Sequence, residues 1–90
     1  MSEDDPGLWP VLVSEAVGDM LADPALPAAV FSAVAALTVA IAQDPWLEGS
    51  QGLEGDPDWR EILIPHGYGI AEYHINQASH TVIVTRIVPF

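Results

Sequence analysis

The stretch between Ala25 and Ala42 constrains the fold most, because it contains no charged residue. Its large apolar side chains recur at helical spacing, at Val30, Val34, Leu37 and Ile41. This pattern predicts a helix over residues 27–43 with one apolar stripe. The other faces are scarcely polar, and a chain of 90 residues can build one modest core but cannot cover such a helix on every side. We therefore expect either an alanine-rich helix lying flat on a sheet or a contact with a partner or a second copy of the chain.

A membrane span is the competing interpretation of this stretch. The run is at the short limit for crossing a bilayer, is diluted by alanine and lacks flanking Lys or Arg anchors, so we expect no membrane partner. Residues 1–7 are acidic and polar where a secretory signal would be basic and then apolar, which predicts a disordered tail and a cytoplasmic protein. Residues 8–90 are expected to form a single domain.

A strand and a short helix are predicted before this helix. The apolar run from Leu8 to Val13 is rich in strand formers, and Ser14 follows it where a helix cap is wanted. Asp23-Pro24 should end the short helix, because proline disfavours helical geometry in the residue before it. Pro27 suits the first turn of the next helix, so the two helices are expected to form an αα-hairpin.

The remainder of the chain predicts a loop and then a sheet. Residues 44–58 are rich in turn formers and are expected to form a loop. Three strand-like runs follow, at Trp59–Ile64, Tyr68–Ile75 and His80–Val88, and they predict a three-stranded antiparallel meander. A tight turn about His66 would place Arg60 opposite Glu72. The fold class is therefore α+β.

The charge balance limits the partners. Thirteen acidic residues stand against Arg60 and Arg86, for a formal net charge of -11, so the chain should be repelled by free nucleic acid and by anionic lipid. A cationic protein partner is expected, unless the acids simply keep an apolar small domain in solution. Without cysteine there is no disulfide framework, thiolate zinc site or cysteine nucleophile. The glycines of residues 44–58 do not form a phosphate-binding loop, and we predict no cofactor.

The order of strand, two helices, loop and three strands resembles the RelE/ParE family of bacterial toxins. The likeness spans nearly the whole expected domain, and it is the succession of weak motifs that carries it. These motifs are Trp9 with Val11 and Val13, Ser14-Glu15-Ala16 with Leu21, Leu37 with Asp44-Pro45, Leu53-Glu54-Gly55, Trp59-Arg60-Glu61, Tyr73 with Ile75, Thr81-Val82-Ile83-Val84, and Arg86-Ile87.

The resemblance implies a toxin of a type II toxin–antitoxin pair, neutralised by an antitoxin protein or peptide. RelE-like members cleave messenger RNA on the ribosome, and ParE-like members poison DNA gyrase. The charge of this chain favours an alternative, a catalytically inactive domain of the same shape that binds proteins. A gyrase-directed action meets less electrostatic objection than RNA cleavage does, because its target is a protein.

The candidate catalytic residues are Arg60, His66, Tyr68, His74 and Arg86. RNA cleavage needs proton transfer and stabilisation of a charged phosphorane, work that Arg, His and Tyr can do. Arg60 matches an arginine common at that place in the resembling family. Each candidate also has a structural interpretation: a turn residue, an exposed strand residue or an ion-pair partner. A metal site across the hairpin from His74 and His80 would lack a third ligand nearby, so no metal is predicted.

Overall fold

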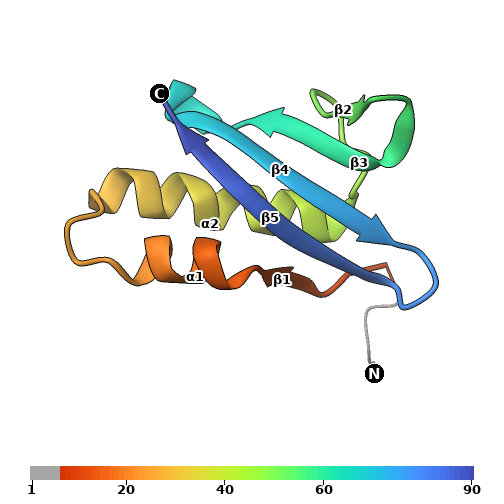
Figure 1. Cartoon of the computed structure of the whole chain (residues 1–90), viewed down its shortest axis with the longest axis horizontal. Helices are drawn as coiled ribbons and strands as arrows, with labels where there is room; N and C mark the ends of the chain where they lie inside the picture. Colours follow the sequence, from red (N-terminus) through yellow and green to blue (C-terminus); the bar gives the residue numbers. More distant parts are fainter. Residues whose placement is uncertain (1–6) are drawn as a thin grey trace.

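The computed structural model describes residues 7–90, so all of the predicted acidic tail except Gly7 lies outside the described residues. The described residues form two helices and a five-stranded sheet, with the helices together on one side of the sheet (Figure 1). The elements in chain order are β1 (Val11–Val13), α1 (Glu15–Ala22), α2 (Ala28–Gln43), β2 (Gln51–Leu53), β3 (Asp56–Leu63), the 3₁₀ turn η1 (Pro65–Gly67), β4 (Gly69–Asn76) and β5 (Thr81–Pro89). The predicted α+β class is confirmed.

The first and last strands of the chain are neighbours in the sheet. Its strand order is β1-β5-β4-β3-β2, and β1 runs parallel to β5 while the other neighbours are antiparallel. A parallel neighbour needs a long crossover connection, and the helical hairpin begins that crossover here. The predicted meander of three antiparallel strands corresponds to β3, β4 and β5.

The helical hairpin begins and ends where the sequence predicts. The Ser14 hydroxyl accepts a hydrogen bond from the Val17 amide at 3.3 Å, which caps α1. The same hydroxyl donates to the Thr85 carbonyl at 3.2 Å, so the cap also ties α1 to β5. Asp23 ends α1 in extended geometry, and Pro27 immediately precedes α2.

The core lies between α2 and the middle of the sheet. The buried face of α2 packs against alternate residues of the three inner strands β3, β4 and β5. The largest buried side chains of this cluster are Ile41, Ile64, Tyr73, Ile75 and Val82. Tyr73 is fully buried, and its hydroxyl donates to the Pro45 carbonyl at 2.7 Å. This bond satisfies the one polar atom of the ring and anchors the chain as it leaves α2.

The expectation that residues 44–58 form only a loop is wrong, because this segment contains β2 and the start of β3. Glu54 and Gly55 have φ values of 51° and 81°, so a two-residue turn closes a hairpin between the strands. Leu53 pairs directly with Asp56 across this turn. β2 could not be recognised from the sequence, because turn formers dominate this segment. The strand is a short edge strand that forms through backbone pairing with β3.

The predicted pairing of Arg60 with Glu72 is also wrong. Arg60 lies opposite Tyr73, and Glu72 lies opposite Glu61 on one side and Arg86 on the other. The connection from β3 to β4 is the 3₁₀ turn η1 and not a tight turn about His66, which shifts the register by one residue. Because neighbouring strand residues point to opposite faces, this shift moves Arg60 to the helix side of the sheet.

Candidate functional site: the open face of the sheet

The face of the sheet that the helices leave uncovered is a candidate functional surface. Along β4, burial alternates, so Tyr73 points to the helices and its neighbours Glu72 and His74 point the other way. The strand register extends these two positions into rows across the sheet. One row is Trp59, His74 and Ile83, and the other is Glu61, Glu72 and Arg86.

The first row makes the open face apolar and aromatic. The rings of Trp59 and His74 lie 4.7 Å apart at an angle of 44°. Trp59 and Ile83 are each 38% exposed, and Leu12, which pairs with Ile83 from the edge strand, is 53% exposed. Exposed apolar side chains that are contiguous across strands are typical of surfaces that contact another protein.

The second row makes the open face negative. Arg86 approaches Glu72 at 3.9 Å, and the Arg86 side chain is 65% exposed. Such an exposed pair contributes little to stability. Glu61 lies beside Glu72 and accepts a hydrogen bond from the side-chain Nε2 of Gln51 at 3.2 Å. The row therefore presents two carboxylates and one guanidinium, a poor arrangement for holding a phosphate.

Arg60 lies away from this face and fastens the loop after α2. Its Nε donates to the Ser50 hydroxyl at 2.9 Å, its Nη2 to the Ser50 carbonyl at 3.0 Å and its Nη1 to the Pro57 carbonyl at 2.8 Å. Three directed bonds occupy the planar fork of the guanidinium. Arg60 is therefore committed to holding β2 and β3 against this loop.

His66 and Tyr68 lie at the opposite end of the sheet, next to the first half of α2. Their rings are 6.1 Å apart, and both line a shallow pocket with Ala33 and Ser32. His66 has φ 69°, so it occupies the left-handed position of the turn, as its interpretation as a turn residue predicts. The five predicted catalytic residues thus occupy three separate places, and only His74 and Arg86 share the open face.

The two histidines of the β4–β5 hairpin are held by different tryptophans. His80 stacks on Trp9 at 3.8 Å and 20°, and Trp9 meets the edge of Trp46 at 5.5 Å, whereas His74 contacts Trp59. These aromatic contacts were not predicted from the sequence. Trp59 and His74 do lie in two strand-like runs that were expected to pair, which is a signal for their contact. Residues 7–90 contain no group of three His, Cys, Asp or Glu side chains that could hold a metal ion. Within the same residues, no helix has the length and apolarity of a bilayer span.

The fold of this chain, a helical hairpin on a mixed sheet whose first and last strands are parallel neighbours, is similar to that of the RelE toxin. The crystal structure of the isolated E. coli RelE toxin matches this chain with a TM-score of 0.74 and 17% identity, over 90% of this chain and 83% of RelE. A double arginine-to-alanine variant of E. coli RelE in the free state matches with a TM-score of 0.73 and 17% identity, over 91% of this chain and 83% of that one.

A RelE variant in complex with an antitoxin RelBc peptide also matches, with a TM-score of 0.72 and 18% identity, over 89% of this chain and 81% of that one. No protein-family model and no curated protein matches the sequence. The likeness is therefore one of fold, and the predicted RelE-like architecture is confirmed.

Proposed function

We propose that this chain is the toxin-type component of a type II toxin–antitoxin pair and that it acts by binding proteins and does not cleave RNA. The RelE fold supports the first half of the proposal. The placement of the two arginines supports the second half, because Arg60 is tied to the loop and Arg86 is paired with Glu72. This placement is the observation that carries the proposal.

The chemistry of RNA cleavage explains why this placement matters. The reaction needs a group that activates the ribose hydroxyl, cationic groups at the developing phosphorane and a group that protonates the leaving oxygen. On the open face, His74 is available for proton transfer. Arg86 is available to stabilise negative charge, but Glu72 at 3.9 Å partly offsets its positive charge. A net charge of -11 also repels RNA over roughly 8 Å at physiological salt, before any local contact forms.

The partner in this proposal is an antitoxin-like protein or peptide. The support is the RelE structure that matches this fold in complex with an antitoxin peptide. A cellular target would be a protein, which keeps a ParE-like action on gyrase within the proposal and removes mRNA cleavage from it. The surface that we assign to such a target is formed by the exposed apolar side chains Trp59, Ile83 and Leu12 on the open face.

RNA cleavage is the second candidate, because His74 and Arg86 lie on one face in adjacent rows. Induced expression in bacteria separates the two candidates when growth and the 5′ ends of cellular messenger RNA are followed together. We expect growth arrest with intact messages, and arrest that survives His74→Ala and Arg86→Ala. New 5′ ends that appear on induction and vanish in both variants would establish cleavage instead. Unaffected growth would reduce the chain to a non-toxic interaction domain.

A further inference from the structure

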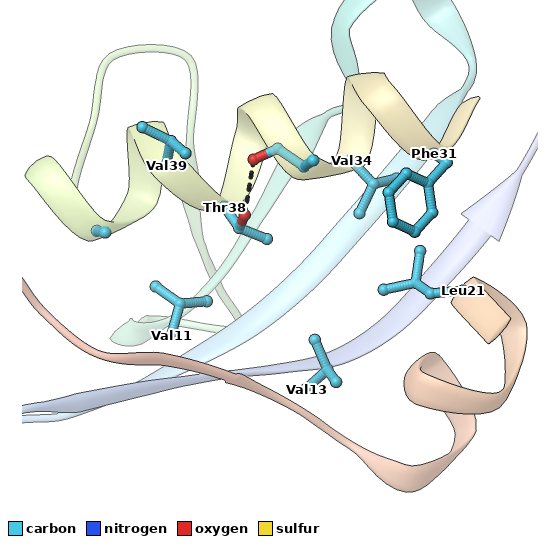
Figure 2. Close-up of a pocket in the computed structure, with 9 residues that line it drawn as sticks. Val11, Val13, Leu21, Phe31, Val34, Thr38 and Val39 are labelled. Carbon is cyan, nitrogen blue, oxygen red and sulfur yellow. Dashed lines mark hydrogen bonds between the residues drawn. The ribbon is translucent and has the colours of Figure 1, made fainter. Parts of the chain in front are cut away.

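An apolar groove lies between α2 and the segment formed by β1 and α1 (Figure 2). Its volume is about 430 Å³. Val11, Val13 and Leu21 form one wall, and Phe31 and Thr38 project from α2 toward them, with Val39 at the rim. The groove thus uses the face of α2 that the sheet leaves uncovered.

The groove offers no free polar group to an occupant. Thr38 carries the one side-chain hydroxyl among the residues that line it, and this hydroxyl donates to the Ala35 carbonyl at 2.7 Å. Every other lining side chain is aliphatic or aromatic. Phe31 is 49% exposed and Val39 is 58% exposed, so the rim also presents apolar surface to water. Side chains that enter this groove must therefore be apolar.

The spacing along α2 suits a second helix. Phe31, Ala35 and Val39 are four residues apart, so they form one ridge with a small residue at its centre. A partner helix can approach closely at Ala35 and place large side chains beside Phe31 and Val39. Helix-in-groove recognition uses anchors at this spacing.

Charge decides what kind of helix fits. Glu15 and Asp19 are exposed on α1, Asp44 follows the end of α2, and α2 itself is uncharged. The two arginines lie elsewhere: Arg60 is bonded to the loop after α2, and Arg86 is on the open face of the sheet. A second copy would bring an equal negative charge to the groove, whereas a basic helix would be attracted to it.

We infer that this groove binds an amphipathic helix of a partner protein, with apolar side chains inserted between α2 and β1 and with lysine or arginine residues along its flanks. The inference rests on the proposed function, because it names the chemistry and the docking place of the antitoxin-like partner. The partner helix is expected to be basic because this chain is acidic.

The test measures binding of a synthetic amphipathic helix of leucine and lysine to the full chain by fluorescence anisotropy. Val39→Asp should weaken binding about tenfold or more, because a docked helix would have to remove water from a carboxylate at the rim of the groove. Ser32→Asp is the matched control, since it adds the same charge at an exposed position of α2 outside the groove, and it should stay within about twofold of the parent chain. Phe31→Gln tests the groove without a charge change.

Three results would overturn the inference. Groove variants that bind as the parent chain does would show that charge alone holds the peptide. A leucine–glutamate peptide that binds equally well would show that the partner helix does not need basic flanks. A chain that forms dimers without peptide, and loses them in Val39→Asp, would assign the groove to a second copy. These readouts are independent of growth and RNA, so groove binding without toxicity would remove the proposed toxin and leave the docking site.

Discussion

At the residue scale, Tyr73 couples stability to alkaline pH. Burial raises the pKa of Tyr73 above its ordinary value of 10.0, while the nearby Ser50 hydroxyl and Arg60 guanidinium oppose that rise. The folded chain therefore keeps the phenol neutral at a pH where the unfolded chain releases its proton. The stability from this group is complete below about pH 10 and is lost as the pH rises through the folded pKa.

We predict that urea unfolding from about pH 8 to pH 11 will show this loss in the parent chain and a smaller loss in Tyr73→Phe. The variant should also be about 1–3 kcal/mol less stable at neutral pH, because the Pro45 carbonyl loses its donor. Parallel pH profiles for the two chains would contradict the assignment. Tyr68→Phe is the control, since that ring is partly exposed.

Arg60 and Arg86 give a matched pair of stability predictions. Arg60→Ala should lower the free energy of unfolding by about 1–3 kcal/mol, because it releases three hydrogen bonds to Ser50 and Pro57. Arg86→Ala should change it by less than about 0.5 kcal/mol, because its pair with Glu72 is exposed. Chemical denaturation measures the free energy of unfolding of both variants. Equal losses would contradict the role of Arg60 in holding the loop after α2. Loss of any activity in Arg60→Ala would therefore report on the fold as much as on chemistry.

At the element scale, the helices could be predicted from the sequence because their signals are local. Ser14 caps α1, Asp23-Pro24 ends it, and the apolar stripe of α2 follows a helical period. The strand β2 and the β3–β4 register could not be predicted in the same way. Both depend on the left-handed backbone of non-glycine residues, at Glu54 and His66, which composition does not reveal.

Two glycines that sit in a helix and in a strand should respond oppositely to alanine. Gly69→Ala should destabilise the chain by about 1–3 kcal/mol, because a β-carbon there would collide with the Val88 carbonyl across the β4–β5 pair. Gly18→Ala should stabilise it by about 0.5–1 kcal/mol, because a β-carbon in α1 meets only Val13 at an ordinary 3.7 Å. Thermal unfolding of both variants checks this, and equal effects would contradict the close approach of the Val88 carbonyl to Gly69.

At the scale of the whole molecule, charge and apolar surface define what the chain can do. The sequence identified the uncharged helix and the negative field, and both point to protein contacts. It could not show that its five candidate residues separate, because their separation follows from the one-residue register shift and from the turn at His66. His74 and Arg86 alone keep a place on one face.

The negative field also predicts a salt effect on stability. Self-repulsion at a net charge of -11 should destabilise the compact state at low ionic strength. Raising NaCl from about 20 mM to about 150 mM shortens the screening length to roughly 8 Å and should raise the melting temperature. Circular dichroism at both salt concentrations measures this, and a lower melting temperature at higher salt would contradict it.

Translating ribosomes can show whether the chain acts on proteins or on RNA. The purified chain is added to a translation reaction on a defined message, and the 5′ ends of that message are mapped. We predict intact messenger RNA at every codon, since Arg60 is tied to the loop after α2 and Arg86 lies beside the Glu72 carboxylate. Cleavage within codons that is lost in His74→Ala and Arg86→Ala would contradict this prediction.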